Sequence, residues 1–307
     1  MGGVTGIHHI TAIAGDPQRN ANFYAGVLGL RLVKKTVNFD DPTTYHLYYG
    51  DAAGSPGTIM TFFPWGNLPS GKVGAAQVVT TAFAVPEGSL GRWRERLREA
   101  GVAVREPGGE GFDREAILFE DPDGLPLALV GSPAPDAEGG VAGFHHAVLC
   151  VRRPERTLRL LAGTLGFARV AEAAGRWRLA AGEGPVGRLV DVVDGAGTQT
   201  GRMGVGTVHH IAFRVPDEEA QRSLREEVAA LGYNVTPVID RKYFRSVYFR
   251  EPGGVLFELA TDPPGFAVDE APEELGRRLQ LPPWLEGRRE EIERTLPPVL
   301  APSGEPA

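Results

Sequence analysis

The pattern of hydrophobic and polar residues is most informative over residues 246–260, where two apolar runs flank a Pro-Gly-Gly turn. This pattern predicts a β-hairpin, because successive side chains of a strand point to opposite faces and Pro and Gly favour turns. In the second run, Glu258 stands between Phe257 and Leu259, within an otherwise apolar strand. A buried carboxylate is costly unless a cation, a hydrogen-bond network or a metal stabilises it. Glu258 is therefore a candidate functional residue.

The same hairpin pattern occurs earlier in the chain, at residues 116–130, around a Pro-Asp-Gly turn. In this copy Ala128 takes the place of Glu258, and Leu118 takes the place of Tyr248. The repeated hairpin therefore requires neither a carboxylate nor a phenol at these two positions. This comparison favours a role in function for Glu258 and Tyr248.

A longer repeat includes these hairpins. Four apolar or alternating stretches are each predicted to form a strand, at 6–14, 76–85, 143–151 and 207–215. Each is followed by a segment compatible with a helix that ends near a glycine, at 17–28, 90–100, 154–165 and 218–231. Further short strands follow each helix, so the sequence predicts an α+β fold of four βαβββ modules.

A stretch of Pro, Gly and small residues at 132–140 separates the second module from the third and is predicted to be a linker. We therefore expect an N-terminal domain at 1–131 with modules one and two, and a C-terminal domain at 141–265 with modules three and four. Each pair of modules is expected to form a partly open β-barrel. Residues 266–307 form a C-terminal tail with a predicted amphipathic helix at 286–296.

Composition narrows the classes of partner. The chain has 307 residues, a formal net charge of -7 and no cluster of Lys and Arg, which argues against nucleic acid and favours a small-molecule partner. Its one cysteine, Cys150, excludes an intramolecular disulfide framework. With no signal peptide and no apolar run of membrane-spanning length, we expect a cytoplasmic protein without membrane contact. We also expect a homo-oligomer.

Three modules begin with a pair of consecutive histidines, whose second members are His9, His146 and His210. Strand alternation sends one histidine of each pair to a given face of the sheet. A lone strand histidine is commonly a hydrogen-bonded core or surface residue, but three repeats of the pair favour ligation. Two histidines and one carboxylate, such as Glu258, make up the facial triad that binds non-haem Fe(II) and leaves positions open for substrate and O2.

These residues resemble a known family. The fourfold βαβββ repeat, the strand-borne histidines and the late glutamate resemble the vicinal oxygen chelate superfamily, which includes glyoxalase I, bleomycin-resistance proteins and extradiol dioxygenases. A narrower resemblance links the chain to ring-cleaving dioxygenases that act on hydroquinones. Its motifs are Gly6-Ile-His-His-Ile-Thr-Ala-Ile-Ala-Gly-Asp, Tyr45-His-Leu-Tyr-Tyr-Gly-Asp and Leu281-Pro-Pro-Trp-Leu-Glu-Gly-Arg-Arg.

The resemblance implies a metal site at His9, His210 and Glu258, with Fe(II) as the metal and Mn(II) as an alternative. A triad of His146, His210 and Glu258 stays open, because it resembles catechol-type extradiol enzymes in which modules three and four share a site. The surroundings of His9 match the hydroquinone enzymes more closely than those of His146, which favours His9.

The resemblance also implies pocket residues around the metal. Tyr248 and Arg241 match an active-site tyrosine and arginine of the hydroquinone enzymes. His8 and His209 are carried over as pocket residues, although strand alternation would send both to the opposite face unless the strands are bulged there.

The function implied is an Fe(II)-dependent ring-cleaving dioxygenase that inserts both atoms of O2 into a hydroquinone-type or catechol-type aromatic. One alternative is a glyoxalase-like lyase or isomerase, with a four-ligand Zn or Ni site and a carboxylate base. The last strand of module one, residues 58–63, contains no carboxylate, which counts against the lyase or isomerase. A second alternative is a non-catalytic protein that binds an aromatic drug or toxin and holds no metal.

Overall fold

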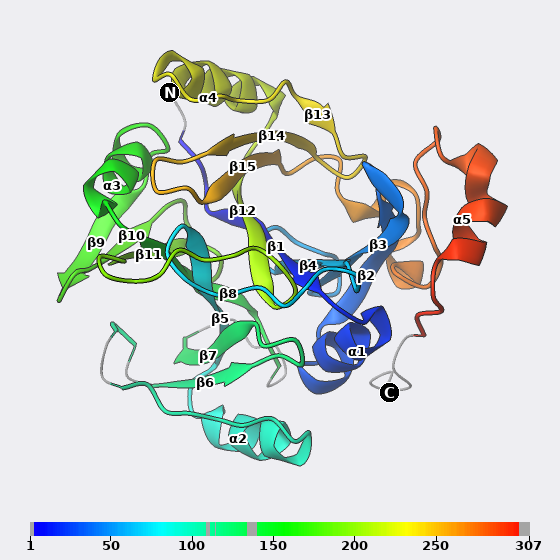
Figure 1. Ribbon diagram of the computed structural model, residues 1–307, viewed down its shortest axis with the longest axis horizontal. Helices are drawn as coiled ribbons and strands as arrows, with labels where there is room; N and C mark the ends of the chain where they lie inside the picture. Colours follow the sequence, from blue (N-terminus) through cyan, green and yellow to red (C-terminus); the bar gives the residue numbers. More distant parts are fainter. Residues whose placement is uncertain (1–2, 109–110, 114, 134–139, 301–307) are drawn as a thin grey trace.

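The computed structural model describes residues 3–108, 111–113, 115–133 and 140–300, and consists of two open sheets with helices on the outside (Figure 1). The eight-stranded sheet has the order β13-β14-β15-β12-β1-β4-β3-β2, and the seven-stranded sheet has the order β6-β7-β5-β8-β11-β10-β9. Figure 1 shows α2 at one end of the molecule and α4 at the other, with the strands between them.

The strands and helices follow the predicted modules. Module one contains β1 (Ile7–Ala14), α1 (Pro17–Ala21), the π-helix η1 (Asn22–Val27), β2 (Arg31–Asn38), β3 (Asp41–Gly50) and β4 (Ile59–Pro64). Module two contains β5 (Gln77–Pro86), α2 (Leu90–Glu99), β6 (Ala116–Glu120) and β7 (Pro126–Ser132). Module three contains β8 (Gly143–Val151), α3 (Pro154–Gly163), β9 (Ala168–Ala173), β10 (Arg176–Ala180) and β11 (Leu189–Asp194). Module four contains β12 (Thr207–Val215), α4 (Glu218–Ala230), β13 (Ile239–Asp240), β14 (Arg245–Arg250) and β15 (Leu256–Thr261).

Two local departures from the predicted repeat have physical causes. The helix expected at 17–28 begins as α1, capped by the Asp16 carboxylate that accepts from the Arg19 N–H, and continues as a π-helix in which the Leu28 N–H donates to the Phe23 carbonyl five residues back. In module two, the described residues between α2 and β6 form only an isolated bridge, from Arg105 to Leu118, instead of a full strand.

The modules pair differently from the expected order. Strand β1 of module one lies antiparallel to β12 of module four, and β5 of module two lies antiparallel to β8 of module three. Each sheet is therefore built by a pair of modules, but the pairs are one with four and two with three, not one with two and three with four. In the eight-stranded sheet, the paired strands β1 and β12 are about 200 positions apart in the sequence. The predicted linker falls largely on residues 134–139, outside the described residues.

The C-terminal tail packs on module one and contains η2 (Phe266–Val268), η3 (Pro272–Glu274), η4 (Glu286–Arg288) and α5 (Arg289–Thr295). Figure 1 shows α5 beside β3. A fully buried lysine of β2, Lys34, forms ion pairs with Asp269, at 2.7 Å, and with Glu270. Burial of a lysine requires such partners, so the tail completes the covering of β2. Among the described residues, no helix has the length and apolar character needed to cross a membrane.

Candidate metal centre

The strands β1 and β12 carry matching β-bulges at their histidine pairs. The register of β1 against β12 passes from Ile7 directly to His9, and that of β12 passes from Val208 directly to His210. His8 and His209 are thus the extra residues of two bulges, which turn consecutive side chains toward the same region. Module two has the same bulge at Val79, which is not a histidine, so the bulge belongs to the fold.

Because of the bulges, each histidine pair is hydrogen-bonded through its Nδ1 atoms. The Nδ1–Nδ1 distance is 2.9 Å between His8 and His9 and 2.8 Å between His209 and His210. One ring of each pair donates and the other accepts, so the Nδ1 atoms are satisfied and the Nε2 atoms of His9 and His210 are left to face each other at 3.3 Å. A partner of this kind fixes the orientation and tautomer of a metal-binding histidine.

His9, His210 and Glu258 converge on one point of the sheet. The Glu258 Oε2 atom lies 3.3 Å from His9 Nε2 and 2.9 Å from His210 Nε2, and all three side chains are buried. Ser246 donates a hydrogen bond to Oε1, whereas Oε2 has no hydrogen-bond partner of acceptable geometry among the described residues. Two imidazole nitrogens and an unsatisfied carboxylate oxygen fit a divalent metal.

Burial and charge interactions within the cluster shift the pKa values of Glu258 and His210. Burial alone would raise the pKa of Glu258, but the neighbouring His9 and His210 outweigh it and hold the pKa well below its usual value. Burial lowers the pKa of His210, while its contact with Glu258 acts in the opposite direction. An ionised carboxylate beside neutral imidazole is the protonation state that binds metals.

A cavity of about 500 Å³ is lined by two of the three residues, His9 and His210. The Tyr248 ring lies edge-on to His210 with 5.7 Å between ring centroids, and the Tyr248 oxygen accepts a hydrogen bond of 3.3 Å from Arg241 Nε. Arg241 also pairs with Asp40 at 2.9 Å. Burial raises the pKa of Tyr248, so its phenol keeps its proton at neutral pH. Phe39, Phe63, Trp65 and Phe244 supply aromatic walls.

The structure places the remaining predicted pocket residues on the two sides of the centre. The His8 ring packs on Phe244, with 5.0 Å between centroids, and does not line the cavity. His209 lines the cavity and contacts the rings of Phe63 and Trp65.

Sequence reasoning missed three residues of β3 and β4. The His46 Nε2 atom lies 2.7 Å from the Thr61 hydroxyl, and the Tyr48 hydroxyl lies 2.8 Å from His46 Nδ1. In register, Thr61 pairs with Thr11 as Glu258 pairs with Ala212, so Thr61 occupies the module-one counterpart of the glutamate position. Strand alternation in the stretch 45–49 places His46 and Tyr48 on one face, which was the available signal.

His146 does not join this centre. It lies in β8 of the seven-stranded sheet, where its Nε2 atom is 3.8 Å from Asp191 Oδ2 and its Nδ1 atom is 2.8 Å from His145 Nδ1. The alternative triad with His210 and Glu258 is therefore not assembled within this chain.

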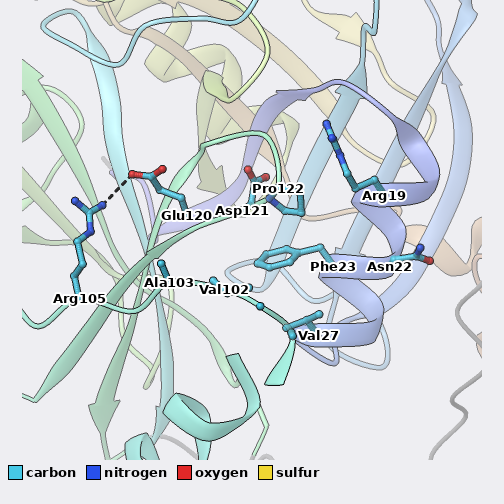
Figure 2. Close-up of a pocket in the computed structure, with 12 residues that line it drawn as sticks. Arg19, Asn22, Phe23, Val27, Val102, Ala103, Arg105, Glu120, Asp121 and Pro122 are labelled. Atoms are coloured by element: carbon cyan, nitrogen blue, oxygen red, sulfur yellow. Dashed lines mark hydrogen bonds and ion pairs between the residues drawn. The ribbon is translucent and has the colours of Figure 1, made fainter. Parts of the chain in front are cut away.

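A further cavity, of about 590 Å³, lies between η1 and β6 (Figure 2). Two of its charged side chains, Arg105 and Glu120, pair with each other at 2.9 Å, and its described lining residues include no histidine. The buried carboxyl group of Asp121 accepts a hydrogen bond from the Tyr24 hydroxyl beside this cavity. This arrangement lacks the converging donor atoms of the His9 centre.

The fold agrees with the family that matches the sequence. The model of the Glyoxalase/Bleomycin resistance protein/Dioxygenase superfamily matches residues 6–129 and 143–259. The chain belongs to this superfamily.

Individual relatives narrow the comparison. The chain is 46% identical over 308 residues to "Putative ring-cleaving dioxygenase MhqO" of Bacillus subtilis (strain 168), with 95% of this chain and 96% of that protein covered. It is 36% identical over 312 residues to the chlorohydroquinone/hydroquinone 1,2-dioxygenase of Sphingobium indicum, with 95% and 96% covered. The crystal structure of a "putative dioxygenase" from Bacillus subtilis matches with a TM-score of 0.93 at 44% identity, covering 98% of this chain and 99% of that one.

Proposed function

We propose that this protein is an Fe(II)-dependent ring-cleaving dioxygenase that acts on hydroquinone-type aromatics and inserts both atoms of O2. The observation that carries this proposal is the convergence of His9, His210 and Glu258 beneath a cavity with aromatic walls. The similarity to the hydroquinone dioxygenase of Sphingobium indicum supports the substrate class. Mn(II) is the alternative metal, since the same donor set suits it.

In this proposal the three ligands set the charge and the openness of the site. His9 and His210 contribute neutral nitrogen donors and Glu258 contributes one negative charge, which leaves coordination positions free. The ion supplies the redox chemistry through which O2 reacts with an aromatic ring. His8 and His209 hold the ligand rings in place through their Nδ1 atoms.

The cavity wall orients the substrate ring and handles charge. Phe244 and Trp65 offer apolar faces for the ring and exclude water. The Arg241 guanidinium stabilises negative charge as a ring hydroxyl loses its proton. The Tyr248 oxygen already accepts from Arg241, so the phenol proton is free to be donated into the cavity.

The reaction balances without another reactant. A hydroquinone and one O2 give a ring-opened product that retains every atom of both, as one ring carbon–carbon bond and the O–O bond break and two new carbon–oxygen bonds form. The nucleotide and reductant sites of other oxygenases are therefore not needed.

The lyase or isomerase alternative is less favoured because of Thr61. A four-ligand site would need a carboxylate at the module-one counterpart of Glu258, and a threonine engaged by His46 and Thr11 stands there. The non-catalytic alternative offers no bound ion to account for the convergence of Glu258 Oε2 on the Nε2 atoms of His9 and His210.

The test is oxygen uptake by protein reconstituted anaerobically with Fe(II). The proposal predicts one O2 consumed per hydroquinone, slower uptake with catechol, and none with apo-protein. Retention of Zn or Ni without any oxygen uptake would contradict the dioxygenase and favour the isomerase. Binding of hydroquinone by apo-protein with no effect of any metal would favour the binding protein.

A further inference from the structure

The seven-stranded sheet repeats the registers of the metal centre at its own middle. In the eight-stranded sheet, Ala212, two residues after His210, pairs with Glu258. In the seven-stranded sheet, Val148, two residues after His146, pairs with Asp191. Asp191 is therefore the counterpart of Glu258, and His146 is the counterpart of His210.

The neighbouring positions of this second cluster differ in chemistry. Arg178 pairs with Asp191 across β10 and β11, as Tyr248 pairs with Glu258 across β14 and β15. In the other half of the sheet, Thr80 stands at the position that His9 holds in module one. Compared with the first centre, this cluster therefore has an arginine in the place of the tyrosine and a threonine in the place of one histidine.

The Arg178 guanidinium is clamped between two carboxylates. Its Nε and Nη2 atoms lie 2.7 and 3.0 Å from the two Asp191 oxygens, and its Nη1 and Nη2 atoms lie 2.7 and 2.6 Å from the two Asp113 oxygens. His146 reaches the same carboxylates, with Nδ1 3.6 Å from Asp113 and Nε2 3.8 Å from Asp191. A positive group is therefore surrounded by the donor atoms that a divalent cation requires.

The charges of this cluster are balanced by protein groups alone. Arg176 Nε also contacts Asp191, at 2.9 Å, so two guanidinium groups face the carboxylates of Asp191 and Asp113. Burial raises the pKa of Asp113, but the hydrogen bonds from Arg178 outweigh it and bring the pKa to about 2. Burial lowers the pKa of His146 to about 3, which leaves the imidazole neutral. Loss of Arg178 would leave buried negative charge in excess.

We propose that Arg178 occupies the place of a metal ion in the sheet of modules two and three, and that without its guanidinium His146, Asp113 and Asp191 bind a divalent cation. The protein then carries one metal centre instead of two because an internal cation fills the second position. A cavity of about 670 Å³, lined by His146, Asp113 and Arg176, gives a hydrated ion access to the cluster.

The experiment counts Mn²⁺ bound to metal-free protein, with the free ion measured by electron paramagnetic resonance. Arg178→Gln is expected to bind one more Mn²⁺ per chain than the wild type, and Arg178→Gln/His146→Ala is expected to lose that ion. Arg178→Lys keeps a positive charge and is the matched control, expected to bind as the wild type does. The result is the difference in bound Mn²⁺ between Arg178→Gln and the wild type, so it does not depend on what the His9 centre binds.

Two results would overturn the proposal: equal counts for Arg178→Gln and the wild type, or an extra ion already present in the wild type at His146. Should Arg178→Gln unfold in metal-free buffer, melting temperature replaces the count. Mn²⁺ is then expected to raise the melting temperature of Arg178→Gln and not that of Arg178→Gln/His146→Ala. Equal shifts in the two variants would contradict the proposal.

Discussion

The Nδ1 atoms of His209 and His210 lie 2.8 Å apart although the two residues are consecutive in one strand. Regular alternation would separate these rings by the thickness of the sheet, and the bulge at His209 brings them together. His8 repeats this relationship to His9 in β1. The Nε2 atoms of His9 and His210 are thus oriented by the residues that precede them in the chain.

Replacement of His209 by alanine should weaken metal binding without removing a ligand. Loss of such a hydrogen-bond partner typically costs about 10–100-fold in metal affinity. Competition with a chelator measures the change. His145→Ala is the matched control, because His145 makes the same Nδ1 contact to His146 outside the centre. Equal effects of the two substitutions would show that the contact is structural.

Introduction of a carboxylate at Thr61 tests whether the centre must stay open. Thr61→Glu places a fourth donor at the module-one counterpart of Glu258. We expect tighter metal retention and a large loss of oxygen uptake with hydroquinone, because a coordination position is filled. Thr61→Val, which removes the hydroxyl but adds no donor, is the control. Full oxygen uptake by a metal-retaining Thr61→Glu would contradict an open site.

The buried Lys34 should make a large contribution to stability. Lys34→Met leaves Asp269 and Glu270 without their buried partner, and breaking such a pair costs about 3–5 kcal/mol. Urea denaturation measures the free energy of unfolding. The side chain of the adjacent Lys35 makes one hydrogen bond within the described residues, to the Val299 carbonyl at 3.4 Å. Lys35→Met should therefore cost about 1 kcal/mol or less, and equal costs for both variants would refute the role of the ion pairs.

The buried carboxyl group of Asp121 should make the free energy of unfolding depend on pH in the acidic range. Burial raises its pKa to about 6, above an unfolded value of about 3.9. Its protonated form is therefore favoured by folding, so this contribution is fully present below about pH 4 and is lost as pH rises to about 6, by at most about 1.4 kcal/mol per pH unit. The carboxyl group lies beside the cavity of Figure 2.

The measurement is the free energy of unfolding of the wild type minus that of Asp121→Asn between pH 4 and pH 7. The difference should fall as pH rises to about 6 and then level off. Glu120→Gln, which removes the neighbouring exposed carboxylate, is the control. A flat difference for Asp121→Asn would contradict the raised pKa.

Much of the fold could be predicted from local patterns. Two apolar runs and the turn residues between them predicted the hairpin that carries Glu258, and glycines marked the ends of the helices. The pairing of modules one and four was not predictable from the same signals, because strand order in a sheet depends on contacts between distant segments. Nothing local to β1 distinguishes β12 from β5 as its partner.

The candidate site was predictable where a residue stood out within its own repeat. Glu258 did so against Ala128, and Tyr248 did so against Leu118. His46 was missed because its significance depends on the contact with Thr61, which lies on another strand. The sequence indicated that His8 and His209 could face the same region as their neighbours only if the strands were bulged there. It could not predict the bulges themselves, because a bulge is defined by the register between two strands.

The central claim is tested most directly by comparing His9→Ala with His146→Ala, each reconstituted anaerobically with Fe(II) and given hydroquinone. The two histidines hold equivalent first-strand positions in different sheets, so the pair is matched. We expect His9→Ala to lose both bound iron and oxygen uptake, and His146→Ala to retain both. Loss of iron and activity in His146→Ala, with both retained in His9→Ala, would contradict the centre described above.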